Sequence, residues 1–161
     1  MNCPWENLHV PELPTLKGRA LRLLSTREHS RVELERKLSA HAESPEQLAK
    51  VLDELQAKGF ISEQRVIDSV LHRRSPKLGA SRIRQELQAK GLDPQAVQAA
   101  VASLQGDEAE RALAVWRRKF GQLPAGASES ARQMRFLATR GFSTDIIRRI
   151  VSGRLSQPGQ D

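Results

Sequence analysis

Cysteine and aromatic residues are scarce in this 161-residue chain, which has one cysteine, no tyrosine and aromatic side chains at only 4% of its positions. A lone cysteine, Cys3, forms no intramolecular disulfide, which is typical of proteins in a reducing compartment, so we expect a cytoplasmic location. The chain also lacks a run of about 18 apolar residues. Residues 1–16 lack the basic start and apolar stretch of a signal peptide. We therefore expect no membrane association.

The residue patterns of common active sites are missing as well. Four histidines are scattered along the chain: His9, His29, His41 and His72. They fall in no metal-binding pattern, and no glycine-rich phosphate-binding loop occurs. Glu33 and Glu35 fall on different sides of a helix, and we interpret Asp107, Glu108 and Glu110 as partners of a helix dipole. The sequence thus predicts a protein that is not an enzyme and that uses no metal or other cofactor.

Positive charge is in excess, with 26 Lys and Arg against 19 Asp and Glu and a formal net charge of +7. Residues 1–61 have nine basic and nine acidic residues, residues 62–105 have seven and four, and residues 106–161 have ten and six. An excess of this kind favours an anionic partner, most often a nucleic acid. We therefore expect the partner-binding surface to lie in the last two thirds of the chain.

The cationic residues of this part fall in groups at helix ends and along helix faces. The candidate partner-contacting or DNA-contacting residues are Arg73, Arg74, Lys77, Arg82, Arg84, Arg117, Arg118, Lys119, Arg132, Arg135, Arg140, Arg148 and Arg149. Basic side chains near a helix end can simply satisfy its last carbonyls. Ten basic residues within the last 56 exceed what such capping requires, so we interpret part of this set as a binding surface.

A repeat of about 50 residues runs through the sequence. Three leucines, spaced 49 and 50 residues apart, mark the same position in each copy: Leu38, Leu87 and Leu137. Six residues after each leucine comes a side-chain oxygen that can cap a helix start: Ser44, Asp93 and Ser143. Pro45 and Pro94 then occupy the first helical position, and Gln47 completes a capping-box pattern with Ser44. The repeat therefore predicts a helix start at the same place in each copy.

Glycine predicts where helices end. Gly59, Gly91 and Gly141 each follow a basic residue at a predicted helix end, where a left-handed backbone is expected. The first copy has Ala42 at the position of Gly91 and Gly141, so its connection must close differently. The aromatic residues that follow two of these glycines, Phe60 and Phe142, are expected to pack back on the preceding turn.

A third helix is predicted at the front of each copy, over residues 15–26, 62–74 and 107–120, with a loop over residues 121–128. On the last of these helices, Trp116 shares an apolar stripe with Leu113 and Phe120, so we interpret it as a core residue and not as a base-stacking one. The sequence predicts an all-α fold of three tandem three-helix repeats in an elongated array. The predicted boundaries are 1–14 for a flexible tail, 15–61, 62–105 and 106–154 for the repeats, and 155–161 for a second flexible tail.

Several stretches resemble the motifs of a known family. The segment from Leu21 to Ser30 (LRLLSTREHS), followed by Glu33-Leu34 and Lys37-Leu38, resembles the opening motif of the RecX family. Lys58 to Ser62 (KGFIS) is similar to its next landmark. Gly79 to Ile83 (GASRI), with Glu86-Leu87 and Lys90-Gly91-Leu92, is similar to the following one. The likeness extends from about Leu16 to Gly153 and is closest in the first two repeats. One departure is at Ser62, after which only Glu63 is acidic, where the family usually has several acidic residues.

The resemblance implies three-helix repeats like modified helix-turn-helix units. It also implies a regulatory function: binding RecA and its nucleoprotein filament, and inhibiting the recombinase, ATPase and co-protease activities that serve DNA repair, recombination and the SOS response. It brings no catalytic residue. We expect a monomer whose partners are RecA and the RecA–DNA filament, with weak direct DNA binding as a further possibility.

Two other functions fit the same residues. A helix-turn-helix DNA-binding module shares the helical repeats and the basic charge, although no winged β-hairpin or dimerisation element is found. A helical-repeat scaffold that binds a protein without nucleic acid is the other alternative. A sequence-specific footprint on naked DNA favours the first of these, and salt-independent partner binding favours the second.

Overall fold

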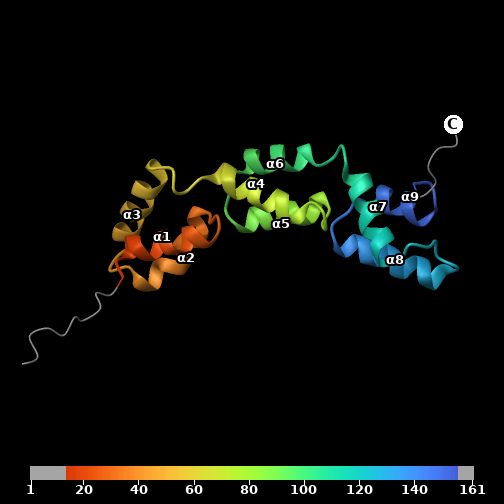
Figure 1. The fold of residues 1–161 in the computed structure, drawn as a ribbon, viewed down its shortest axis with the longest axis horizontal. Coiled ribbons are helices and arrows are strands. Elements are labelled where there is room, and N and C mark those ends of the chain that lie inside the picture. Colours follow the sequence, from red (N-terminus) through yellow and green to blue (C-terminus); the bar gives the residue numbers. More distant parts are fainter. Residues whose placement is uncertain (1–13, 156–161) are drawn as a thin grey trace, which may run out of the picture. The chain divides into compact units, whose positions relative to one another are not determined.

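The structure is a computed structural model that describes residues 14–155 (Figure 1). Within that range it contains nine α-helices, one short 3-10 helix and no strand, which confirms the predicted all-α fold. The chain divides into two compact units, residues 1–61 and 62–161. The predicted tails lie outside the described residues except for Pro14 and Leu155. Leu155 is half-buried against the core of the third repeat.

The first unit holds the first three-helix repeat. It consists of α1 (Leu16–Thr26), α2 (Arg31–Leu38), the 3-10 helix η1 (Ser39–His41) and α3 (Pro45–Ala57). Its apolar core is made by Leu16, Ala20, Leu34, Leu38, Leu48, Leu52, Leu55 and Ile61. The helix α2 runs into η1 and then into Ala42, whose backbone is extended with φ −89°, and no glycine is needed there. This confirms that the first repeat closes differently from the other two.

The second unit holds the second and third repeats. The second repeat consists of α4 (Glu63–Arg74), α5 (Ala80–Ala89) and α6 (Pro94–Ser103), and the third consists of α7 (Glu108–Lys119), α8 (Ala127–Thr139) and α9 (Thr144–Val151). Each has a separate apolar core, the second around Ile83 and Leu87 and the third around Trp116 and Leu137. Trp116 is 2% exposed and its indole N–H donates to Gln133 Oε1 at 2.7 Å, which confirms it as a core residue.

The predicted helix starts are found, but their capping bonds differ in detail. The side chains of Ser44 and Asp93 accept from the amides of Gln47 and Ala96, as expected. The Gln47 side chain, however, accepts from the amide of Glu43 at 2.8 Å, so the predicted reciprocal bond to Ser44 is wrong. Ser143 stands at the N-cap position of α9, but its side chain accepts no capping hydrogen bond. The N-cap residues in the sequence therefore predict where a helix starts more accurately than they predict which capping hydrogen bond forms.

Helix ends follow the glycine signal. Gly59, Gly91 and Gly141 have φ values of 77°, 67° and 82°, which confirms the predicted left-handed stops. Phe142 is 5% exposed and packs in the third core, which confirms its predicted packing, whereas Phe60 is 48% exposed and is not part of the first core. In the first unit the next residue, Ile61, enters the core in its place and is 4% exposed.

Candidate partner-binding surface

Arg111, on α7, links the third repeat to the second. Its side chain is 11% exposed, and its Nη1 donates to the carbonyls of Ser75 and Leu78 at 2.9 and 3.0 Å. Its Nη2 donates to the carbonyl of Leu104 at 2.9 Å, and its Nε donates to Asp107 Oδ1 at 2.9 Å. One guanidinium group thus donates to two carbonyls of the α4–α5 connection and to one at the end of α6. These hydrogen bonds are charge-assisted and therefore stronger than those between neutral groups.

Glu108 makes a second link at the same junction. It is 7% exposed, and its Oε1 accepts from the amide of Ala80, the first residue of α5, at 3.0 Å. The N-cap of α5 is Gly79, which has no side chain to supply this bond. Glu108 therefore caps α5 from the third repeat, where a carboxylate also complements the helix dipole. The sequence predicts that Glu108 interacts only with the dipole of its own helix, α7, and the structure adds the contact with α5.

Two glycines let the backbones of the repeats meet. The amide of Gly79 donates to the carbonyl of Arg140 at 2.8 Å, and the amide of Ser81 donates to that of Gly141 at 3.3 Å. A Cβ at Gly79 would lie 2.3 Å from Gly141 O, and a Cβ at Gly141 would lie 2.5 Å from the backbone N of Arg82. The junction is therefore a direct backbone contact that side chains at either position would push apart.

A basic pocket, here named the junction pocket, lies beside this contact. It has a volume of about 300 Å³ and is lined by Lys77 from the α4–α5 connection, by Val115, Arg118 and Lys119 from α7, and by Phe136 and Arg140 from α8. Among the described residues, no acidic one lines it. The Arg140 guanidinium carbon lies 3.6 Å from the centre of the Phe136 ring, and Nη1 donates to the Phe136 carbonyl at 3.1 Å, so the cation is held in place. Such a pocket can bind a phosphate or carboxylate group.

The junction pocket brings together four of the thirteen predicted cationic residues, and others lie elsewhere on the second unit. Arg74 and Arg82 line a different hollow, in which Arg74 Nε is paired with Glu86 at 2.9 Å and Arg82 donates to Gln85 at 3.1 Å. Arg84 lines a separate hollow with the buried Glu108. Carboxylates beside Arg74 and Arg84 reduce the local positive potential at both places.

The remaining predicted residues do not gather at one place. Arg73 Nε donates to the carbonyl of Ser69 within α4 at 3.2 Å. Arg132 is 3.6 Å from Glu129 and 5.6 Å from the centre of the Phe120 ring. Four further residues are exposed: Arg117, Arg135, Arg148 and Arg149. The sequence-predicted set is thus one pocket of four cations together with scattered solvated ones.

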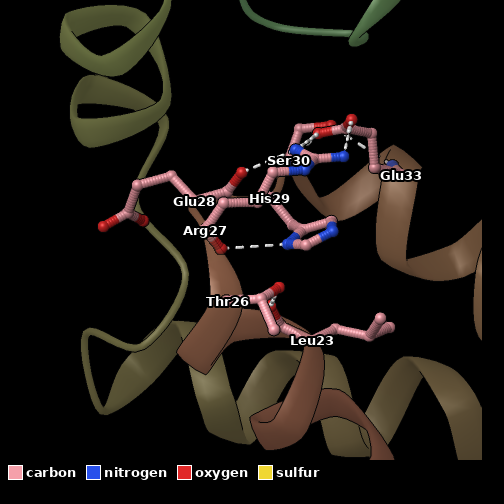
Figure 2. Close-up of polar contacts among 7 residues, drawn as sticks. All are labelled: Leu23, Thr26, Arg27, Glu28, His29, Ser30 and Glu33. Atoms are coloured by element: carbon pink, nitrogen blue, oxygen red, sulfur yellow. Dashed lines mark hydrogen bonds and ion pairs between the residues drawn. The ribbon is translucent and has the colours of Figure 1, made fainter.

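In the first unit, the corner between α1 and α2 is a polar cluster (Figure 2). The Ser30 side chain accepts from the amide of Glu33, and Glu33 Oε2 accepts from the amide of Ser30, which makes a complete capping box. Arg27 Nη2 pairs with Glu33 Oε1 at 3.0 Å. His29 is 1% exposed, its Nδ1 lies 3.0 Å from the carbonyl oxygen of Arg27, and burial lowers the pKa of its imidazole. These contacts fix the entry into α2.

Residues 14–155 hold no cluster of three or more His, Cys, Asp or Glu that could bind a metal ion. None of the described helices is long and apolar enough to cross a lipid bilayer. The expectation that the protein uses no cofactor and catalyses no reaction remains a prediction.

Three family models match the chain one after another. They describe the first, second and third three-helix domains of RecX, and they match residues 17–55, 62–101 and 106–151. The chain belongs to the RecX family.

Its relatives support the assignment over nearly the whole length. The Regulatory protein RecX of Leptothrix cholodnii is 53% identical over 141 residues, which cover 88% of this chain and 89% of that protein. The Regulatory protein RecX of Ralstonia nicotianae is 46% identical over 145 residues, covering 89% and 91%. A crystal structure of RecX from Lactobacillus salivarius superposes with a TM-score of 0.68 at 22% identity, covering 88% of this chain and 94% of that one, and so shares the fold.

The structure gives physical roles to the motifs that resemble RecX. The TREHS part of the opening motif builds the α1–α2 corner, and Gly79 of the GASRI motif makes the backbone contact at the junction. At the departure after Ser62, that residue still caps α4 by accepting from the amide of Arg65. Arg111 and the Ser30–Glu33 box are not among the sequence predictions, although the spacing Ser-x-x-Glu is a known helix-start signal.

Proposed function

We propose that this chain regulates RecA by binding it and its nucleoprotein filament and by limiting its recombinase, ATPase and co-protease activities. Three consecutive RecX domains and relatives named Regulatory protein RecX support a regulatory function. RecA as the target is what membership of the family implies. In this proposal the protein limits RecA by occupying a surface of RecA or of its filament, without catalysing a reaction.

We further propose that the junction pocket is part of the contact surface. The lining that the structure describes has four cations and no carboxylate, and one of the cations is already held against an aromatic ring. Pre-organised cations lose little side-chain entropy when an anionic group binds. A RecA–DNA filament offers such groups as exposed carboxylates and as DNA phosphates.

The test follows ATP hydrolysis by RecA on single-stranded DNA with increasing amounts of the protein. The variant Arg118→Gln/Lys119→Gln removes two charges from the junction pocket, and the matched control Arg148→Gln/Arg149→Gln removes two exposed charges from α9. We expect the pocket variant to need about tenfold more protein for half-inhibition, since one charge-assisted hydrogen bond contributes about 1.5 kcal/mol or more.

Each other outcome has a separate meaning. Equal losses in the two variants would show that the surface is diffuse and that the pocket is not its centre. A parent protein that leaves RecA hydrolysis unchanged would overturn the proposed function itself. Circular dichroism of each variant checks that the helices are intact, as expected for changes at exposed side chains.

A further inference from the structure

The first unit has as many acidic as basic residues by sequence, but the structure separates them in space. Several of its carboxylates are held in ion pairs. Glu54 Oε1 lies 2.6 Å from Lys17 Nζ and 2.8 Å from Lys58 Nζ, and Arg31 pairs with Asp53 at 2.6 Å and with Glu35 at 3.0 Å. The hydrogen bond from Lys17, followed by that from Lys58, lowers the pKa of Glu54 to about 2. These acids are therefore occupied by particular cations.

Three of the cations that make none of these ion pairs line one hollow, here named the first-unit pocket. Its volume is about 390 Å³, and its lining includes Arg19 and Arg22 from α1, Lys37 from α2 and His41 from η1, with apolar contact from Leu23 and Leu38. None of the described residues that line it is acidic. Arg22, Lys37 and His41 are exposed, and none of the ion pairs within residues 14–155 involves Arg22 or Lys37. Positive potential is thus concentrated at this pocket, although the first unit has as many acidic as basic residues.

We propose that the first-unit pocket binds the phosphate groups of a single-stranded nucleic acid. Two guanidinium groups and an ammonium group provide several donors for phosphate oxygens, and guanidinium geometry suits bidentate contact with phosphate. The apolar walls suit the sugar and base that accompany each phosphate. This site is separate from the junction pocket and does not require RecA.

A nucleic-acid strand fits the two pockets better than a folded acidic protein does. Phosphates recur at every nucleotide, and a single strand is flexible, so one strand can occupy two sites without a fixed geometry between them. A folded protein surface needs its carboxylates at one fixed spacing. Pockets in both units therefore favour a flexible polyanion.

The experiment measures binding of fluorescein-labelled oligo(dT) to the full chain by fluorescence anisotropy at several salt concentrations, with no RecA present. The test variant is Arg22→Gln/Lys37→Gln. The matched control is Arg36→Gln/Lys50→Gln, which removes the same charge from exposed positions of α2 and α3 outside the pocket. Two lost phosphate contacts reduce the slope of log Kd against log salt by about 1.4 and weaken binding about 25-fold at about 0.1 M salt. The control changes only long-range attraction, and we expect less than about a threefold effect.

Two results would overturn the proposal. One is equal weakening by both variants, which would assign the effect to net charge alone. The other is displacement of oligo(dT) by poly-glutamate as readily as by unlabelled oligo(dT) at the same charge concentration, which would assign the pocket to carboxylates. A parent protein that binds oligo(dT) but fails to inhibit RecA leaves this site in place and removes only the proposed function.

Discussion

Replacing Gly79 with alanine should open the contact between the second and third repeats. The backbone of Gly79 has φ −79° and ψ 168°, which alanine adopts without strain, so the substitution acts through space alone. The added Cβ would lie 2.3 Å from Gly141 O and 2.4 Å from Phe142 N, and both are backbone atoms. Relief to ordinary contact requires the two backbones to separate by about 1 Å.

That separation breaks the two backbone hydrogen bonds of the junction, from Gly79 to Arg140 and from Ser81 to Gly141. At about 0.5–1.5 kcal/mol each, the local loss is about 1–3 kcal/mol. The matched control is Gly126→Ala. Gly126 is also a helix N-cap with an extended backbone, and a Cβ there meets no atom within 4 Å. Both substitutions change capping preference and unfolded-state entropy alike, so their difference isolates the close approach.

The assay is amide hydrogen exchange in the native state. We expect the amides of residue 79 and Ser81, which donate these two bonds, to lose protection by a factor of about 5 to 150 in Gly79→Ala, which corresponds to the local free energy above. Protection in the core of the first unit, for example at Leu52, should not change. If Gly79→Ala and Gly126→Ala gave the same protection at these amides, the backbone contact would not stabilise the junction and the reasoning from distances would fail.

Three further changes test other contacts. Asp93→Ala should lower the free energy of unfolding by about 0.5–2 kcal/mol in urea melts, whereas Ser143→Ala should change it by less than about 0.5 kcal/mol, because only Asp93 makes a capping bond; equal effects would contradict the structure. Arg111→Met should lower the free energy of unfolding by about 2–4 kcal/mol, because three carbonyls lose their donor. An effect no larger than that of the control Arg117→Met, at an exposed position of the same helix, would refute this. Burial lowers the pKa of His29, so the urea midpoint should hold above about pH 6.5 and fall as the unfolded state gains a proton below it. His29→Gln should lack that decline, and a decline of the same size in the variant would place its cause elsewhere.

The helical repeat could be predicted because its signals are local. Leucine spacing, the cap residues and the glycine stops act within one or two helical turns, and the structure shows helices where they predict them. The contacts between repeats could not be predicted in this way. An acid in a first helical turn gives one sequence pattern whether it faces its own helix or caps another, and Glu108 does the latter.

The candidate site was predictable only as a set of residues. Charge counting points to the second and third repeats, and four of the thirteen predicted cations line one pocket. The sequence does not say which four, because folding brings Lys77 and Arg140 together from positions far apart in the chain. Arg111 was not among the thirteen, because its carbonyl acceptors are brought together only by folding. The first-unit pocket could not be predicted from the sequence, because a balanced net charge does not show where the individual charges lie.

The capping of α5 by Glu108 has a consequence for the order of events during synthesis. The first turn of α5 leaves the ribosome before Glu108 does, since its partner lies 28 residues downstream. Until then the amide of Ala80 has only water as a partner. The second repeat therefore reaches its final form after the third repeat has begun to emerge, and a nascent chain that has emerged only as far as Gln105 carries an α5 that frays at its start. In ribosome-bound chains of increasing length, the amides in the first turn of α5 should become protected from hydrogen exchange in one step, when α7 emerges.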